Sequence, residues 1–136
     1  MEKLNNLLQS KKSILNKKGI YILHWYSGDK PREIYRLVGV DSKGILYIGC
    51  TKKRTLIKRL ENVATVFQAN KKQMHTLGIR LHTSPLKGLI KLEDIYVSYT
   101  FTEEAEKLEK QEISKYIKKH GEEPPLNSKI LNPSKS

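Results

Sequence analysis

The chain has 136 residues, the length of one domain, and 38% of them are hydrophobic, which allows a modest core. With 26 Lys and Arg against 14 Asp and Glu, its formal net charge is +12. This charge favours a polyanionic partner. Nucleic acid is a better candidate for that partner than an anionic membrane surface. The single Cys50 excludes an intrachain disulfide, and four scattered histidines argue against a zinc site. No signal-peptide core or membrane-spanning run is present, so we expect a cytoplasmic protein.

Apolar spacing predicts the elements of the first half of the chain. Leucines and isoleucines at helical spacing indicate a short bracing helix within residues 1–16. Three runs rich in aromatic and β-branched side chains predict strands over 19–26, 34–40 and 45–49. Their short connections favour an antiparallel meander. A helix is predicted over 53–69, where apolar side chains recur on one face.

The second half of the chain adds one strand and one helix. Residues 94–101 alternate as a strand does. The helix that follows is expected to be capped by Thr102 and to end at Gly121. The sequence therefore predicts a single α+β domain, a small and mainly antiparallel sheet flanked by helices, with a core over 18–128 and a frayed tail over 129–136.

Two carboxylates of this last helix fall on its buried side, Glu109 near the centre and Glu112 near the edge. A carboxylate facing a core costs free energy unless it is paired, hydrogen-bonded or bound to a metal. A structural ion pair with Lys or Arg and a ligand for Mg²⁺ or Mn²⁺ are both open from the pattern. The apolar residues that define the buried side are Ala105, Leu108, Ile113, Tyr116 and Ile117.

Arg59 is predicted to lie at the edge of the apolar face of the helix over 53–69. There its stem can cover the core while its planar guanidinium points into a groove. Such a fork matches two oxygens of a phosphate group. The alternative is an ordinary surface arginine without a ligand.

Two triplets place a tyrosine near a glycine within predicted strands, Gly19-Ile20-Tyr21 and Tyr47-Ile48-Gly49. Strand tyrosines are usually core residues with a satisfied hydroxyl, and that is the expectation for the others. Tyr21 and Tyr47 differ because glycine in a strand often marks a close backbone approach. The tyrosines expected to be ordinary core residues are Tyr26, Tyr35, Tyr96 and Tyr99.

Further polar residues follow the triplets along the chain. Lys52 and Lys53 come directly after the second triplet, where a phosphate would pass, although a solvated surface explains them equally well. Asn127 follows two prolines that stiffen the chain and can bring its amide back over the sheet. A turn asparagine is the alternative.

Taken in order, the two triplets, a helix arginine, a helix glutamate and a C-terminal asparagine resemble the GIY-YIG nuclease family over roughly residues 18–128. The resemblance implies a metal-dependent DNA endonuclease that hydrolyses phosphodiester bonds with Mg²⁺ or Mn²⁺, with no membrane partner and no small-molecule cofactor. It assigns catalytic roles to Tyr21, Tyr47, Arg59, Glu109 and Asn127, with Glu109, or alternatively Glu112, as the metal ligand.

The resemblance also implies a division of roles. Tyr21 would help to activate the attacking water, and Tyr47 would position the water and the phosphate. Arg59 would contact the scissile phosphate. A phenol of ordinary pKa near 10 is a poor base at pH 7, so nearby cations or the metal would have to lower the pKa of Tyr21.

The chain departs from the family pattern at several places. An insertion over 27–43 separates the triplets, and Arg59 follows Gly49 at a greater distance than is common. Val63 stands where many members carry His or Tyr, and Cys50 stands where many carry Lys.

These departures bear on activity more than on fold. Gly49, Lys52, Lys53 and His75 are the residues expected beside the substrate, and Lys52 or His75 would replace the missing lysine. The alternative function is a nucleic-acid-binding module of the same fold that has lost cleavage.

Overall fold

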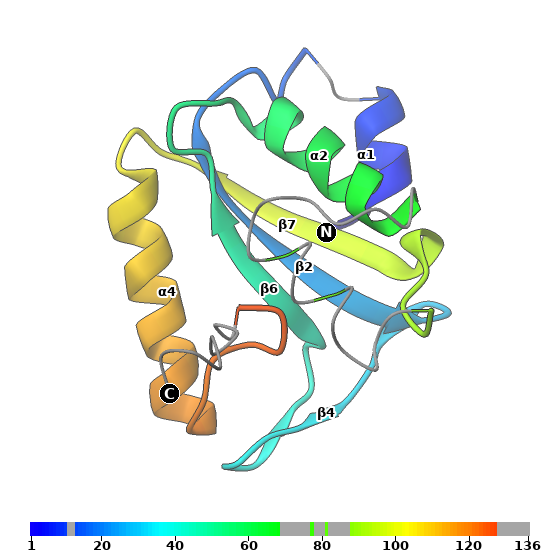
Figure 1. The fold of residues 1–136 in the computed structure, drawn as a ribbon, viewed down its shortest axis with the longest axis vertical. Coiled ribbons are helices and arrows are strands. Elements are labelled where there is room, and N and C mark those ends of the chain that lie inside the picture. Colours follow the sequence, from blue (N-terminus) through cyan, green and yellow to red (C-terminus); the bar gives the residue numbers. More distant parts are fainter. Residues whose placement is uncertain (11–12, 69–76, 78–80, 82–87, 128–136) are drawn as a thin grey trace, which may run out of the picture.

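The structure is a computed structural model that describes residues 1–10, 13–68, 77, 81 and 88–127 (Figure 1). It has the α+β architecture that the sequence predicts. The described helices are α1 (Leu4–Ser10), α2 (Leu56–Gln68), the 3₁₀ turn η1 (Leu92–Asp94) and α4 (Ala105–His120). The strands are β1 (Glu2–Lys3), β2 (Gly19–Ser27), β3 (Lys30–Pro31), β4 (Ile34–Tyr35), β5 (Val40–Asp41), β6 (Ile45–Cys50) and β7 (Ile95–Phe101).

The long strand β2 is the centre of the sheet. It pairs antiparallel with β6 on one side and with β7 on the other, and β1 extends the sheet beyond β7. In this register Tyr21 lies opposite Gly49 of β6 and Tyr99 of β7. The pairing with β6 shifts at a bulge between Leu23 and His24. The two triplets are therefore direct neighbours in the sheet.

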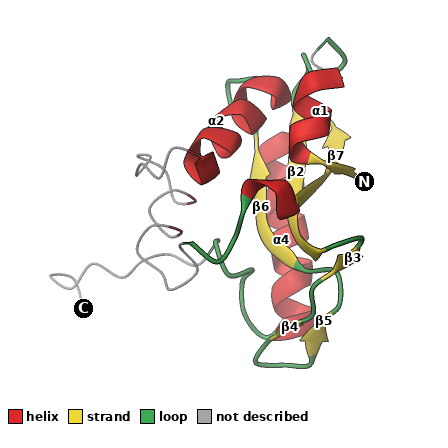
Figure 2. Ribbon diagram, turned by 90° about the vertical axis from the view of Figure 1, so that its right-hand side faces the viewer, coloured by secondary structure: helices red, strands yellow, loops and turns green. Residues whose placement is uncertain are grey.

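Helices cover both faces of this sheet. Tyr21 and Leu23 of β2 belong to an apolar cluster with α1 and α2, whereas Ile20 of β2 and Cys50 of β6 pack against Ala105 of α4. Figure 1 shows α1 and α2 side by side, and α4 on the other side of the molecule next to β6. Figure 2 shows the same layers from the side. None of the described helices has the length and apolar character that a membrane span requires.

The boundaries of the helices follow from contacts of their first and last turns. α2 begins at Leu56 instead of 53, because the N–H groups of Leu56 and Ile57 donate to the carbonyls of Lys17 (2.8 Å) and Leu15 (3.1 Å). α4 ends at Gly121 as predicted, in the left-handed conformation with φ 78°.

Details at the two ends of α4 differ from the expectation. Thr102 accepts a hydrogen bond from the N–H of Glu104 (3.0 Å), but Glu104 itself is the N-cap residue. The prediction that Ile117 is buried was wrong, since its side chain is 38% exposed. In this last part of α4 the buried side chains are Tyr116 and His120, so the buried side of the helix passes beside Ile117.

The middle strand of the expected meander is absent. Instead of one strand over 34–40, β4 and β5 pair with each other in a separate hairpin, and β2 pairs directly with β6. The turn of the β4–β5 hairpin is closed by a hydrogen bond from the N–H of Arg36 to the carbonyl of Gly39 (3.1 Å). Tyr35 in this hairpin is mostly exposed, so the prediction that it is a core residue was wrong.

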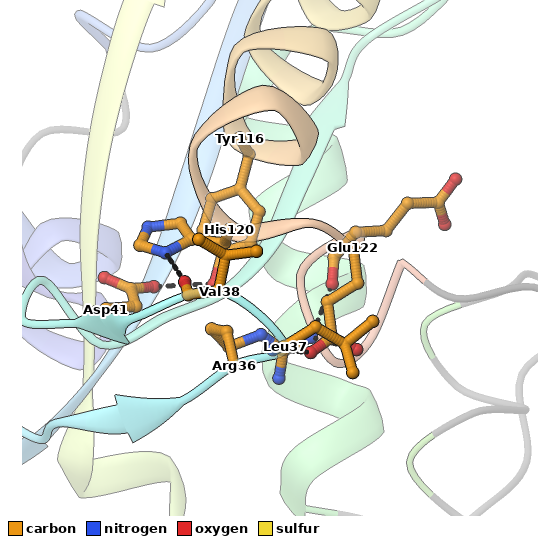
Figure 3. A network of polar contacts seen from close by, with 8 residues as sticks. Arg36, Leu37, Val38, Asp41, Tyr116, His120 and Glu122 are labelled. Atoms are coloured by element: carbon orange, nitrogen blue, oxygen red, sulfur yellow. Dashed lines mark hydrogen bonds and ion pairs between the residues drawn. The ribbon is translucent and has the colours of Figure 1, made fainter.

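A buried polar contact joins this hairpin to α4 (Figure 3). The Tyr116 hydroxyl donates to Oδ2 of Asp41 at 2.8 Å. The same carboxylate accepts the N–H groups of Lys43 (2.8 Å) and Ile45 (3.1 Å). Burial, followed by this hydrogen bond to Asp41, raises the pKa of Tyr116 well above its ordinary value. Asp41 thus fixes both the turn before β6 and the last part of α4.

The tip of the hairpin is held by the residues that end α4. The N–H of Val38 donates to the carbonyl of His120 (3.0 Å), and the N–H of Leu37 donates to Oε2 of Glu122 (2.8 Å). Arg36 forms an ion pair with the same Glu122 at 3.1 Å. These contacts explain why the segment leaves the sheet: its backbone groups find partners at the end of α4.

The Tyr116–Asp41 contact gives a stability prediction. Tyr116→Phe removes a buried hydrogen bond to a carboxylate and should lower the free energy of unfolding by about 2 kcal/mol. Tyr35→Phe, which changes an exposed tyrosine of the hairpin, is the matched control. It should leave the free energy of unfolding unchanged within about 0.5 kcal/mol. Urea unfolding at pH 7 measures both. Equal midpoints for Tyr116→Phe and the control would contradict this account.

Candidate active site

Gly49 lies beneath the rings of the two triplet tyrosines. The ring centroids of Tyr21 and Tyr47 are 6.1 Å apart. A Cβ atom at Gly49 would lie 2.5 Å from Cζ and Oη of Tyr21 and 2.7 Å from Cε2 of Tyr47. Only glycine leaves room for both rings at this place, which confirms the close approach expected from the sequence.

Gly19, the other triplet glycine, is enclosed by the neighbouring strand and the following loop. A Cβ atom there would collide with the carbonyl oxygen of Thr100 in β7. The N–H of Gly19 donates to Oγ1 of Thr51 (3.2 Å), and the N–H of Thr51 donates back to the carbonyl of Gly19 (3.1 Å). This pair of bonds fastens the start of β2 to the loop that leads from β6 into α2.

Arg59 of α2 joins the two tyrosines. Its guanidinium lies at the Tyr21 hydroxyl, where its charge and a hydrogen bond act to lower the pKa of that phenol. The Arg59 side chain is half-buried, at the edge of the apolar face as predicted. Its Nε is fully buried and has no hydrogen-bond partner among the described residues. A buried donor of this kind costs free energy unless a ligand satisfies it.

Glu109 of α4 is the carboxylate that acts on the two triplet tyrosines. Its negative charge acts on the phenols of Tyr21 and Tyr47 and on the thiol of Cys50, and raises the pKa of all three groups. The side chain is half-buried, and among the described residues it forms no ion pair. The expectation of a carboxylate on the inner side of α4 is confirmed, and no structural salt bridge explains it there.

Glu112, the alternative ligand, lies in different surroundings. It pairs with Lys115 one turn along α4, at 3.4 Å. Its charge is not among the main influences on the pKa of either triplet tyrosine. The geometry therefore favours Glu109 over Glu112 as the carboxylate of the site.

Burial controls the ionisation of the site. It raises the pKa of Tyr21 well above the ordinary value near 10, and the charge of Tyr47 acts in the same direction against Arg59. Burial and then Glu109 raise the pKa of Tyr47. Burial and then Glu109 also raise the pKa of Cys50 to about 11. Arg59 lowers the pKa of both phenols, as expected of a nearby cation, but the effect of burial is larger. Both phenols are therefore neutral at pH 7 and can donate hydrogen bonds.

Both polar atoms of the Asn127 side-chain amide form hydrogen bonds to the backbone of β6. Its Oδ1 accepts the N–H of Ile48 (2.8 Å), and its Nδ2 donates to the carbonyl of the same residue (2.9 Å). The prolines before it thus return the chain to the sheet, as expected. This geometry gives Asn127 a positioning role behind Tyr47, and its catalytic role stays a prediction.

The remaining predicted contacts lie around the loop after β6. Lys52 and Lys53 are exposed there, and Lys52 has the unusual positive φ of 49°. Their contact with a phosphate stays a prediction, and His75 lies outside the described residues. Val63 is packed in the core, so α2 offers no His or Tyr at that place.

The sequence did not reveal that Glu109 acts on the thiol of Cys50 and raises its pKa. The only signal was the position of Cys50: it follows Gly49 directly and therefore points to the face of β6 that α4 covers.

Comparison of the chain with models of known families, with curated proteins and with solved structures found no match. Within the described part of the chain, no three His, Cys, Asp or Glu side chains gather closely enough to bind a metal between them. Glu109 fits a divalent cation as a single carboxylate ligand, because Mg²⁺ commonly keeps several waters and takes one or two carboxylates.

The raised pKa of Tyr21 gives a prediction at alkaline pH. A tyrosine of the unfolded chain ionises near pH 10, whereas folded Tyr21 keeps its proton, so stability falls as pH rises above 10. Tyr21→Phe removes this loss. Its free energy of unfolding should fall less steeply than that of the wild type between pH 10 and 11.5, by up to about 1.4 kcal/mol per pH unit. Urea unfolding over this range measures the slopes, and identical slopes would contradict the assignment.

Proposed function

We propose that this protein is a metal-dependent DNA endonuclease of the GIY-YIG type, which hydrolyses phosphodiester bonds with Mg²⁺ or Mn²⁺. The observation that carries the proposal is the buried Nε of Arg59, which has no hydrogen-bond partner among the described residues. It belongs to a guanidinium that acts on two neutral phenols, as does Glu109, a carboxylate that forms no ion pair within the described part of the chain. A phosphate group would accept from the guanidinium and both hydroxyls. The net charge of +12 supports a polyanionic substrate.

Each side chain has a role that its surroundings favour. Arg59 offers Nε and a terminal nitrogen to two phosphate oxygens and balances the extra charge of the transition state. Tyr21 and Tyr47 orient the phosphate and the attacking water as donors. Glu109 would hold the divalent cation, which when bound supplies positive charge at the leaving oxygen. Proton removal by Tyr21 itself is opposed by its burial.

A nucleic-acid-binding module without cleavage is the second candidate. Two observations favour it: Val63 lies in the core where many members of the resembled family carry a polar residue, and Tyr21 is almost completely buried. Cleavage and binding assays separate the two functions. A cytoplasmic location belongs to the same proposal and is supported by a single, buried and free cysteine.

The metal-ligand role gives a direct test on supercoiled plasmid DNA. Glu109→Gln keeps the shape of the side chain but removes its charge, so nicking with Mg²⁺ or Mn²⁺ should fall at least about 100-fold. Glu93→Gln is the matched control, since it removes the same charge from an exposed site in η1 and should nick as the wild type does. Circular dichroism melts confirm that both variants are folded.

Two outcomes would change the assignment. Normal nicking by Glu109→Gln together with loss of nicking by Glu112→Gln would move the ligand to Glu112. Binding of plasmid by the wild type with no nicking in either metal would favour the binding module.

The charge of the chain predicts how binding responds to salt. DNA affinity should fall steeply from 50 to 200 mM NaCl, with a log–log slope of about −4 to −6, because each phosphate contact releases counterions. Glu109→Gln should keep this slope, since the lysines and arginines supply the contacts. Fluorescence anisotropy with a labelled duplex measures both proteins, and a slope near zero would exclude nucleic acid as the partner.

A further inference from the structure

The β4–β5 hairpin carries an apolar surface that the proposed active site does not use. Four large side chains are exposed on it: Tyr35 by 80%, Leu37 by 77%, Val38 by 56% and Val40 by 39%. Scattered apolar residues are common on protein surfaces, but a contiguous group on one short segment usually marks an interaction site. Figure 1 shows the hairpin at the far end of α4, away from α1 and α2.

The N–H groups of Leu37 and Val38 at the hairpin tip are already satisfied by the protein (Figure 3). The N–H of Leu37 donates to Glu122, and Val38 bonds to His120 through its N–H (3.0 Å) and through its carbonyl, which lies 3.3 Å from Nδ1. These three backbone groups therefore keep a partner in an apolar environment, where an unpaired polar group would cost free energy. The outer surface of the tip is apolar.

The surroundings of the tip are positively charged. A cavity of about 200 Å³ lies between the turn that precedes β6 and the last half of α4, and Lys43, Lys115 and Lys119 line it. Asp41 and Glu112 line the same cavity, but both are engaged, since Asp41 accepts from Tyr116 and Glu112 pairs with Lys115. Glu122 near the tip pairs with Arg36. Lys43 and Lys119 are thus the cavity lysines that form no ion pair among the described residues. An apolar projection beside several lysines fits an occupant that is apolar within and anionic outside. Stacked base pairs between two phosphate backbones have this character.

We propose that the hairpin is a wedge that inserts Leu37 and Val38 between base steps of duplex DNA, while Lys43 and Lys119 contact the flanking phosphates. The inference rests on the DNA partner of the proposed function and adds a second contact to it. The stretch of α4 from Glu109 to His120 is roughly 16 Å long at 1.5 Å per residue, which corresponds to about five base pairs. The wedge and the active site are thus spaced to act on one duplex.

An inserted wedge unwinds DNA, and this can be measured without cleavage. Relaxed plasmid is incubated with the protein and a metal-independent topoisomerase in EDTA, and the change in linking number is read after removal of protein. The test variant is Leu37→Ser with Val38→Ser, and the matched control is Leu89→Ser, which changes an equally apolar side chain that is 61% exposed elsewhere. All three proteins are compared at equal occupancy, set by anisotropy.

The wild type and Leu89→Ser should shift the topoisomers equally, and the double variant should lose at least about four-fifths of the shift. Its affinity should fall by about tenfold or less, because phosphate contacts supply most of the binding. Both changed side chains are exposed, so a wild-type melt is expected and is checked first.

Several results would overturn the wedge. The first is a wild type that binds DNA without changing the linking number, and the second is a double variant that changes it as the wild type does. Either leaves the endonuclease proposal intact if Mg²⁺-dependent nicking persists, whereas a wild type that does not bind DNA overturns both proposals. A double variant that converts a dimer into a monomer with an unchanged topoisomer shift would show that the tip joins two copies of this chain.

Discussion

The direct pairing of β2 with β6 is the constraint on which the candidate site depends. It sets Tyr21 opposite Gly49, and because Gly49 has no side chain, the rings of Tyr21 and Tyr47 can share the space above it. The reciprocal bonds between Gly19 and Thr51 hold the ends of the two strands together just before α2 begins. Arg59 is therefore placed by the sheet, through a short loop that has little freedom.

Low exposure gives the site its electrostatic character. Two buried phenols meet one half-buried guanidinium and one half-buried carboxylate, so the two charges act on the phenols with less screening than in water. Burial keeps Tyr21 and Tyr47 protonated in spite of Arg59. The group is thereby suited to receive an anion with donors that are already oriented, a form of preorganisation that lowers the cost of binding charge.

The features that the sequence predicted correctly are those with a local pattern. Runs of aromatic and β-branched residues identified β2 and β6, and alternation identified β7. Helical spacing placed Arg59 at the edge of the apolar face of α2, and glycine marked the end of α4. The segment over 34–40 has the composition of a strand, yet its partners are Glu122 and His120, far along the chain. The influence of Glu109 on the Cys50 thiol is of the same kind, since only the packing of α4 on β6 brings the two residues together.

The return of the chain after α4 has a consequence for self-association. Leu126 donates its N–H to the carbonyl of Leu46 (2.9 Å), and the amide of Asn127 bonds to Ile48 as the main chain of a further strand would. An open strand edge is a template on which identical molecules can stack into extended fibrils. One asparagine side chain therefore completes the hydrogen bonding of β6 at this place, so the proposed catalytic edge offers no such template to another copy.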